Sequence, residues 1–233
     1  MNSMRISLLH RPAAALAVAA GLLAAAVLFL LMLGSEIAER ETEIFDRAVL
    51  QWLRDMFGSY SGLKRVMLDI TALGDTIVLT FTVLAVTGFL LTLRRYRLAG
   101  ILIVQAAVGT SLASLAKLWF ARARPSIIEH WAEVSSASFP SGHAANSAVV
   151  YFALAILAGR AVPTAAGRCY LLGIAAALVA AIGVSRMYLG VHWPTDVIAG
   201  WALGGSWAIF GWVVTERLAP RVSSDRFVSR NPA

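Results

Sequence analysis

The chain is poor in charged residues, in lysine and in cysteine. Of its 233 residues only 14% are Asp, Glu, Lys or Arg, whereas 59% are hydrophobic. A soluble domain of ordinary composition carries about 25% charged residues, so this balance indicates a protein that faces lipid. The single cysteine, Cys169, excludes an internal disulfide and a cysteine-based metal or redox motif, and we interpret it as a small apolar filler.

Basic residues outnumber acidic ones, which by itself is typical of nucleic-acid binding. The formal net charge is +7 and the isoelectric point is about 10.3. The arginines, however, lie at the edges of apolar segments rather than on one polar face, and this distribution is typical of membrane topology. We therefore predict a lipid bilayer rather than a nucleic acid as the partner of the chain. The composition leaves the oligomeric state open.

Six apolar stretches are long enough to cross a bilayer as helices. A hydrocarbon core of about 30 Å needs roughly 20 apolar residues in a helix, and runs this long and continuous exclude β-barrel strands. Between the first two stretches, Phe45, Val49, Leu53 and Phe57 recur at helical spacing. We predict an all-α, six-helix membrane bundle in a single domain, 1–233, with a short amphipathic interfacial helix between the first two spans. The predicted spans are 12–34, 76–93, 98–120, 144–163, 168–188 and 194–215.

Arginine is concentrated in alternate connections, and such segments are expected on the cytoplasmic side. With six spans, both termini, the second turn and the fourth turn share that side. The acid-rich stretch 35–75 then lies on the far side with the loops 121–143 and 187–193, and the tail 217–233 is cytoplasmic. The stretch 35–75 either packs over the bundle or forms a lid at a lipid entrance. The arginines that set this orientation are Arg5, Arg11, Arg94, Arg95, Arg97, Arg160, Arg168, Arg217, Arg221, Arg226 and Arg230.

Three clusters of polar residues fall at one end of the predicted bundle. Polar side chains at membrane depth are costly, so they are functional hypotheses by default. In the first cluster, Lys117 and Arg124 lie seven residues apart and share a face if the helix continues. Two cations on one face suit a phosphate. The alternative is a pair of snorkelling side chains at a helix end, and we interpret Arg122 in that way.

The second cluster, Pro140-Ser141-Gly142-His143, comes directly before the fourth span. Pro-Ser-Gly is a turn sequence that delivers backbone N–H groups to a helix start, where an anion is favoured. Gly142 allows the backbone to approach a ligand closely, and Ser141 can donate its hydroxyl. His143 lies where an imidazole can donate a proton. The alternative is an N-cap turn next to an unrelated histidine.

The third cluster contains Ser185, Arg186, His192 and Asp196. His192 and Asp196 are four residues apart, so the carboxylate can hold one ring nitrogen and leave the other free to attack. The alternative, an interfacial arginine and a helix-capping aspartate, leaves His192 without a role. His143 and His192 lack the carboxylate-rich neighbourhood or the thiolates of a metal site, so we predict no metal. We also predict no cofactor. Together the clusters describe an anion pocket suited to phosphoryl transfer.

These clusters resemble the signature of the type 2 phosphatidic acid phosphatases. That signature is Lys, six residues, Arg-Pro; then Pro-Ser-Gly-His; then Ser-Arg, five residues, His, three residues, Asp. The sequence matches every fixed position in order within 117–196. The matching residues are Lys117, Arg124, Pro125, Pro140, Ser141, Gly142, His143, Ser185, Arg186, His192 and Asp196.

The resemblance implies a metal-independent lipid phosphatase that forms a phosphohistidine. In that case His192 is the nucleophile, Asp196 its orienting partner and His143 the general acid. Bacterial members act on lipid phosphates at the periplasmic face of the inner membrane, which agrees with the charge-based orientation and makes 35–75 periplasmic. The implied phosphate-binding residues are Lys117, Arg124, Ser141, Gly142 and Arg186, whereas Pro125, Pro140 and Ser185 are signature positions without an assigned role.

The signature identifies the phosphate and not the lipid. Undecaprenyl pyrophosphate is our first candidate, because it is a periplasmic-face lipid and this small chain has no extra recognition domain. Phosphatidylglycerophosphate, phosphatidic acid and phosphorylated lipid A are the others, and transfer of the phosphate to a second lipid is an open alternative. Vanadium-dependent haloperoxidases share the residue set, but they are not six-helix membrane proteins of this size.

A non-enzymatic alternative is an anion transporter or an inactive lipid-binding protein, since intramembrane cations also suit a transporter. The polar residues gather at one face rather than along a pore, and no inverted repeat is visible. An inactive relative is expected to have lost His192, His143 or Asp196, and all three are present. We therefore favour the enzyme.

Overall fold

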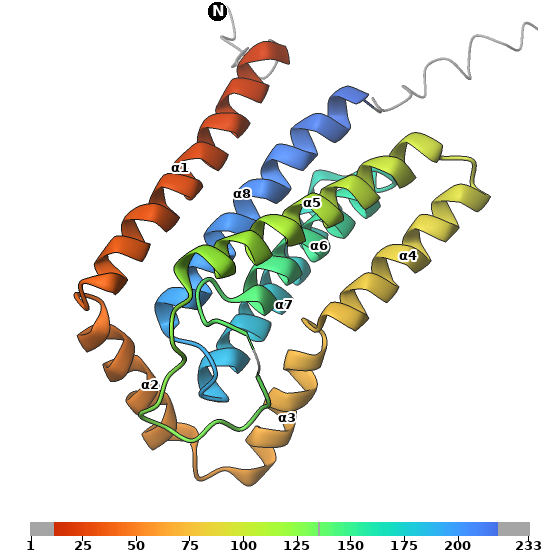
Figure 1. Ribbon diagram of the computed structural model, residues 1–233. Helices are drawn as coiled ribbons and strands as arrows, with labels where there is room; N and C mark the ends of the chain where they lie inside the picture. The colour runs from red at the N-terminus through yellow and green to blue at the C-terminus, as the bar shows by residue number, and fades with distance from the viewer. Residues whose placement is uncertain (1–11, 135, 219–233) are drawn as a thin grey trace, which may run out of the picture.

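The computed structural model describes residues 12–134 and 136–218, which form eight α-helices joined by turns and loops (Figure 1). No strand occurs in these residues, so the all-α prediction is confirmed. The helices are α1 (Pro12–Ala38), α2 (Glu43–Phe57), α3 (Ser61–Ala72), α4 (Thr76–Thr92), α5 (Tyr96–Phe120), α6 (Gly142–Gly159), α7 (Ala165–Tyr188) and α8 (Pro194–Leu218).

Among the described residues, five helices are long and apolar enough to cross a membrane: α1, α5, α6, α7 and α8. A sixth span exists if α3 and α4, which are bent by 45° at a short break, are taken together. The predicted span 76–93 corresponds to α4 alone, which has 17 residues. At 1.5 Å per residue α4 is about 26 Å long, short of a 30 Å hydrocarbon core. The described part of the chain therefore provides five or six candidate spans, as expected of a multi-pass membrane protein.

Two helices, rather than one, occupy the acid-rich stretch between α1 and α4. The amphipathic helix predicted around Phe45–Phe57 is α2, whereas α3 was not predicted. The buried residues of α2 are Asp46, Leu50 and Leu53. Phe45, which the sequence pattern grouped with the apolar face, is 50% exposed. The inward face of α2 is therefore rotated from the predicted one and carries a carboxylate, and its location at a membrane surface stays a prediction.

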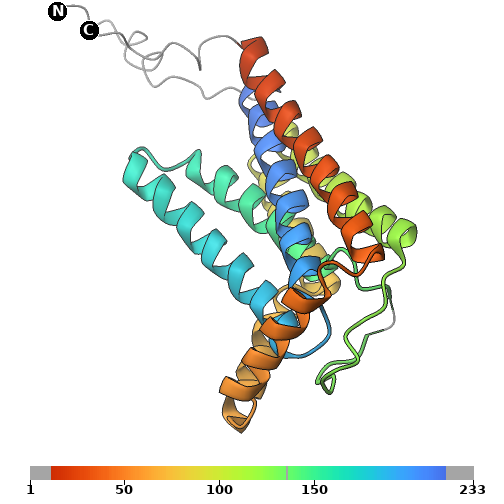
Figure 2. The ribbon, with the colours of Figure 1, turned by 90° about the vertical axis from the view of Figure 1, so that its left-hand side faces the viewer.

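The connections between helices gather at two opposite ends of the molecule (Figures 1 and 2). One end holds the start of α1, the α4–α5 turn, the α6–α7 turn and the end of α8. The other end, called here the site end, holds α2, α3 and the loops 121–141 and 189–193. This arrangement matches the division that the arginine pattern predicts, although Arg5, Arg11, Arg221, Arg226 and Arg230 lie outside the described residues. Which end faces the cytoplasm stays a prediction.

Glycines on α8 allow it to lie against α6. A Cβ added at Gly200 would lie 2.7 Å from the carbonyl oxygen of Ser141, and one at Gly204 would collide with the backbone of Ala145. Small residues four apart allow helices to approach closely inside a membrane. The start of α6, with His143, is thereby held beside the start of α8. This packing positions the site.

Candidate active site

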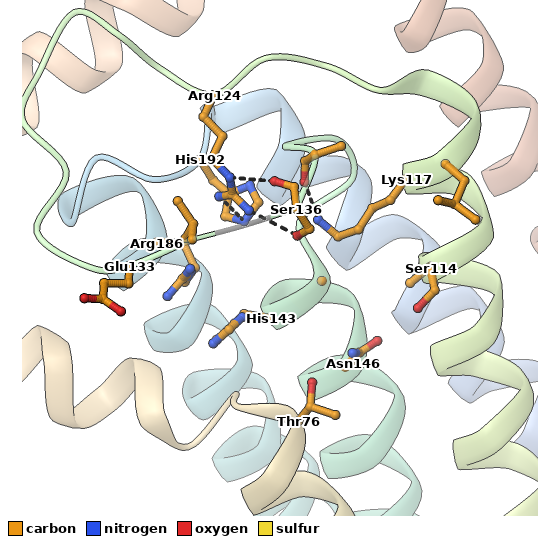
Figure 3. A pocket seen from close by; sticks show the side chains of 15 residues that line it. Thr76, Ser114, Lys117, Arg124, Glu133, Ser136, His143, Asn146, Arg186 and His192 are labelled. Atoms are coloured by element: carbon orange, nitrogen blue, oxygen red, sulfur yellow. Dashed lines mark hydrogen bonds between the residues drawn. The ribbon is translucent and has the colours of Figure 1, made fainter.

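A cavity of about 570 Å³ opens at the site end (Figure 3). Its walls come from α4, α5, α6 and α7 and from the loops on either side of them. Six of the residues predicted from the sequence line it: Lys117, Arg124, Gly142, His143, Arg186 and His192. Five further polar residues that the motifs did not indicate also line it: Thr76, Ser114, Glu133, Ser136 and Asn146. Three cationic side chains and two imidazoles therefore share one cavity.

Lys117 and Arg124 reach the cavity, although they do not share a helix. α5 ends at Phe120, and Ala121 has a φ of 45°, so the chain leaves the helical path before Arg124. The assumption of a continuing helix is therefore wrong. Lys117 Nζ donates to the carbonyl oxygen of Ala137 at 2.7 Å, and Arg124 Nε donates to that of Ser136 at 2.9 Å. Loop 121–141 thus folds back so that both cations bind its own backbone at the cavity.

His192 and Asp196 face each other as their spacing predicts. Nδ1 of His192 lies 3.3 Å from Oδ2 of Asp196, and both side chains are buried. The same carboxylate oxygen accepts the backbone N–H of Trp193 at 2.9 Å and the hydroxyl of Ser138. On the other side of the ring, Nε2 lies 3.3 Å from Nη1 of Arg124. One ring nitrogen is therefore held by a carboxylate, while the other faces a cation of the cavity.

The local sequence accounts for the position of Asp196. α8 begins at Pro194, which suits the first helical position because it has no N–H to leave unpaired. Trp193 is then the N-cap, and Asp196 accepts its N–H from the third helical position, as the acidic member of a capping box does. A negative charge is also favoured in the first turn by the helix dipole. One carboxylate thus caps α8 and orients His192.

The turn Pro140–His143 leads into α6 as predicted. Gly142 begins the helix, and a Cβ added there would lie 3.2 Å from Cε of Lys117. His143 follows it and lines the cavity (Figure 3). Ser141 differs, because its hydroxyl is buried, has no partner within the described residues and is not part of the cavity lining. Its backbone N–H donates to the carbonyl oxygen of Asp196 at 2.9 Å, which links α6 to α8.

Arg186 has a donor left over for a ligand. The residue is 4% exposed, and its Nη1 donates to the hydroxyl of Thr71 at 2.9 Å. Its Nε is buried and has no partner in the described part of the chain. A buried donor without a partner is costly, and a bound anion would satisfy it.

Besides Ser141 and Asp196, three further signature residues lie outside the cavity lining: Pro125, Pro140 and Ser185. The hydroxyl of Ser185 donates to the carbonyl oxygen of Ile182 at 2.6 Å, within α7. Pro125 and Pro140 are buried, and the carbonyl oxygen of Pro125 lies 2.5 Å from Nε2 of His130. These residues shape the backbone around the cavity.

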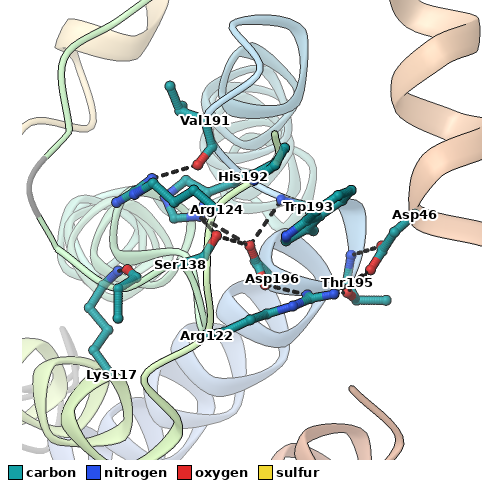
Figure 4. Close-up of polar contacts among 12 residues, drawn as sticks. Asp46, Lys117, Arg122, Arg124, Ser138, Val191, His192, Trp193, Thr195 and Asp196 are labelled. Atoms are coloured by element: carbon teal, nitrogen blue, oxygen red, sulfur yellow. Dashed lines mark hydrogen bonds and ion pairs between the residues drawn. The ribbon is translucent and has the colours of Figure 1, made fainter. Parts of the chain in front are cut away.

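Arg122 is not the interfacial charge that we predicted. Only 13% of its side chain is exposed, and it pairs with two buried carboxylates (Figure 4). Nη1 lies 2.6 Å from Oδ1 of Asp196, and Nη2 lies 2.7 Å from Oδ2 of Asp46. Sequence reasoning also missed Ser138 and Thr195, which complete this network. The only feature of the nearby sequence that could have indicated this network is the presence of a second arginine, Arg122, two residues before Arg124.

A family model, the PAP2 superfamily, matches residues 96–219, which is more than half of the chain. The chain belongs to the PAP2 superfamily. Phosphatidylglycerophosphatase B of Bacillus subtilis is 30% identical to this PAP2 protein over 178 residues, which cover 76% of this chain and 86% of that protein. An undecaprenyl-diphosphatase of Sulfolobus acidocaldarius is 35% identical over 143 residues, covering 58% of this chain and 64% of that protein.

The fold agrees with that of a solved PAP2 structure. The crystal structure of a transmembrane PAP2-type phosphatidylglycerolphosphate phosphatase from Bacillus subtilis matches this PAP2 protein with a TM-score of 0.78 and 27% identity. The match covers 84% of this chain and 96% of that chain. These relatives are named as phosphatases, which are phosphoric ester hydrolases. The predicted family and enzyme class are therefore confirmed.

The surroundings of His192 in this PAP2 protein favour its neutral form. Burial lowers the pKa of His192 to about 4, an effect that Arg124 and Arg186 reinforce and the hydrogen bond to Asp196 opposes. Burial also lowers the pKa of Arg124, but a guanidinium keeps its proton in proteins. Near neutral pH the imidazole of His192 is therefore uncharged and has a lone pair on one nitrogen.

Positive charge in the cavity comes from side chains. Within residues 12–134 and 136–218, no three His, Cys, Asp or Glu side chains gather as a metal site would require. Lys117, Arg124 and Arg186 instead line the cavity beside both histidines. That the reaction needs no metal stays a prediction.

Proposed function

We propose that this protein is a metal-independent lipid phosphatase that acts through a phosphohistidine on His192. The observation that carries the proposal is the buried His192–Asp196 pair at the wall of a cavity with three cationic side chains. A nucleophile, a group that orients it and charges that stabilise phosphoryl oxygens are what phosphoryl transfer requires. The family and its named phosphatases support the same chemistry.

In the first step, Nε2 of His192 attacks the phosphorus, and the bond from phosphorus to the lipid oxygen (or to the bridging oxygen of a pyrophosphate) breaks. Asp196 accepts a hydrogen bond from Nδ1–H and stabilises the positive charge that develops on the ring. The three cations of the cavity stabilise the charge on the equatorial oxygens. His143 donates its proton to the leaving oxygen. The products are a phosphohistidine and a dephosphorylated headgroup.

In the second step, water attacks the phosphorus of the phosphohistidine. His143, now without its proton, takes one from that water, and the bond between phosphorus and Nε2 breaks. Inorganic phosphate leaves, His192 is again neutral and His143 is again protonated. The same two histidines thus complete the cycle.

An apolar groove beside the cavity supports a lipid as the substrate. It lies between α4 and α5, has a volume of about 290 Å³ and shares Thr76 and Asn146 with the cavity. Its walls consist mostly of aliphatic side chains such as Leu79, Val83 and Ile103. A phosphate bound by the cations would therefore place an attached hydrocarbon chain against apolar helix surfaces inside the membrane.

Two lipids are the leading candidates. Undecaprenyl pyrophosphate is the one that we predict from the sequence, and a relative of 35% identity carries the name undecaprenyl-diphosphatase. Phosphatidylglycerophosphate is supported by the relative that covers the larger share of this chain. The protein lies in the inner membrane in this proposal, and the arginine pattern supports cytoplasmic termini and a periplasmic site end.

The test is phosphate release by the purified full-length protein in detergent with EDTA present. Undecaprenyl pyrophosphate, phosphatidylglycerophosphate and phosphatidic acid are compared, with His192→Ala as the inactive variant and Glu43→Gln, at an exposed position of α2, as a control outside the cavity. We expect phosphate release that resists EDTA, that is abolished in His192→Ala and that is retained in Glu43→Gln. Folded wild-type protein that releases no phosphate from any of these lipids, or release that persists in His192→Ala, would contradict the proposal. A lipid acceptor added to the same assay separates hydrolysis from phosphate transfer between lipids.

A further inference from the structure

Asp46 is the buried acidic residue of α2, and it lies within the network that holds the catalytic carboxylate. We propose that Asp46 is a positioning residue for the reaction, which acts through Arg122 and the first turn of α8 on the carboxylate of Asp196. This inference rests on the proposed function, because it assigns a role in that same chemistry. Neither Asp46 nor Arg122 lines the cavity, so neither is in a position to touch the phosphate.

Arg122 bridges the two carboxylates (Figure 4). Its Nη2 lies 2.7 Å from Oδ2 of Asp46, and its Nη1 lies 2.6 Å from Oδ1 of Asp196. Because Oδ1 of Asp196 is held by Arg122, the other oxygen, Oδ2, is directed at Nδ1 of His192. The rotation of the catalytic carboxylate is therefore set by a guanidinium whose far side is held by Asp46.

Asp46 also holds the helix that carries Asp196. Its Oδ1 accepts the backbone N–H of Thr195 at 3.0 Å, and its Oδ2 accepts the hydroxyl of Thr195 at 2.8 Å. Thr195 is the second residue of α8, so Asp46 satisfies an N–H group in the first turn that the helix itself leaves unpaired. Arg122 Nη1 donates to the same hydroxyl at 2.8 Å. Asp46 of α2 thus caps the N-terminus of α8.

The network is buried and charged, which makes it sensitive to single changes. Asp46 and Asp196 are both fully buried. Removing one partner of a buried ion pair leaves the other charge uncompensated, which destabilises the folded protein more than the loss of an exposed pair does. Without Asp46, the guanidinium of Arg122 has one carboxylate left to satisfy it. We therefore expect Asp196 to be drawn toward Arg122 and its hydrogen bond to His192 to weaken.

α2 provides a matched control. One turn before Asp46 in the same helix, Glu43 pairs with Arg47, and both side chains are well exposed, at 37% and 45%. Exposed pairs contribute little to stability. A change of Glu43→Gln therefore removes a carboxylate from the same helix without touching the site.

The experiment compares Asp46→Asn with Glu43→Gln in detergent, measuring kcat, KM and the thermal unfolding temperature with the preferred lipid. We expect Asp46→Asn to lower kcat at least roughly tenfold, with KM changed less than about threefold. Glu43→Gln retains wild-type kcat. A folded Asp46→Asn protein with wild-type kcat overturns the inference, as does a variant that changes KM alone.

A double-mutant comparison distinguishes positioning from general weakening of the fold. Asp46→Asn is introduced into an Asp196→Asn background, and single-turnover rates are measured. If Asp46 acts through Asp196, we expect its tenfold effect to shrink to less than about twofold in that background. If Asp46→Asn lowers the single-turnover rate by the same factor in both backgrounds, the inference is overturned. If Asp46→Asn fails to fold, Arg122→Lys, which keeps the charge but loses the bridging geometry, is judged by the same criteria.

Failure of the inference and failure of the proposed function give different results. Wild-type protein without His192-dependent phosphate release contradicts the proposed function, and with it the role of Asp46. His192-dependent release that Asp46→Asn leaves unchanged contradicts the role of Asp46 alone.

Discussion

Nδ1 of His192 lies 3.3 Å from Oδ2 of Asp196, and both side chains are withdrawn from solvent. A carboxylate can only accept a hydrogen bond, so this contact places the ring proton on Nδ1 and leaves the lone pair on Nε2. Nε2 is the nitrogen that faces Arg124 and the cavity. A contact four residues apart in the sequence therefore determines which nitrogen is free to attack.

Asp196→Asn should lower kcat by roughly 100- to 10,000-fold with little change in KM. The amide can donate a hydrogen bond to Nδ1, which favours the tautomer whose proton is on Nε2 and removes the attacking lone pair. Phosphate binding depends on the cations and should persist. Steady-state kinetics with the preferred lipid measures both constants, and an unchanged kcat would mean that Asp196 only caps α8.

His143→Gln should slow the hydrolysis of substrates with poor leaving groups more than that of substrates with good leaving groups. An alkoxide must be protonated as it leaves, whereas a nitrophenolate does not need a proton. We expect a loss of roughly 100-fold or more on the lipid phosphate, and less than about tenfold on p-nitrophenyl phosphate. The ratio of kcat/KM for the two substrates is the measurement. Equal losses on both substrates would contradict a role as general acid.

Arg124→Lys should weaken inhibition by vanadate about tenfold or more. Lysine keeps the charge, but its single ammonium nitrogen lacks the planar fork with which the guanidinium of Arg124 reaches the backbone of Ser136 and Val191 from two different nitrogens. Arg95→Lys, in the turn at the opposite end, is the control and should leave the inhibition constant unchanged. Equal inhibition constants for wild type and Arg124→Lys would remove Arg124 from the phosphate-binding set.

Acid should destabilise the folded protein through His192. Burial lowers the pKa of His192 to about 4, against an ordinary value of about 6.5 in the unfolded chain. Between these values the unfolded state binds more protons, so stability rises with pH in this window. The contribution of neutral His192 is complete above about pH 6.5 and is lost as the pH falls towards 4.

Thermal unfolding in detergent between pH 4 and 7.5 tests this effect against His192→Gln, which has no proton to bind at that position. We expect the unfolding temperature of the wild type to fall more steeply with acid than that of His192→Gln. Parallel curves would show that His192 does not contribute to the pH dependence.

The membrane helices were predictable because each is a long apolar run. The predicted spans 98–120 and 194–215 end within three residues of α5 and α8. α3 was missed because Ser61–Ala72 mixes polar and apolar residues in a short helix. Whether α3 and α4 together form one bent span depends on tertiary packing, which the hydropathy along the chain does not show.

The site was predictable where its residues follow one another closely. His192 and Asp196 are four residues apart in the sequence and contact each other. Gly142 and His143 are sequence neighbours, and both line the cavity. The partners of Arg122 and Asp46 are not local, because 76 residues separate Arg122 from Asp46 and 149 separate Asp46 from Thr195. Without the fold, Arg122 is one more arginine at the end of an apolar segment, which is why we misinterpreted it. The prediction that Lys117 and Arg124 share a helix face was wrong, because α5 ends at Phe120.

The most direct measurement is capture of the covalent intermediate. The wild-type protein is mixed with the preferred lipid phosphate, quenched in base within the first turnover, digested and analysed by mass spectrometry, with Asp196→Asn and His192→Ala alongside. The account predicts a phosphoryl group on His192, stable to base and lost in acid, and none in His192→Ala. Turnover by the wild type with no phosphoryl group on His192, or with the group on another residue, would contradict it.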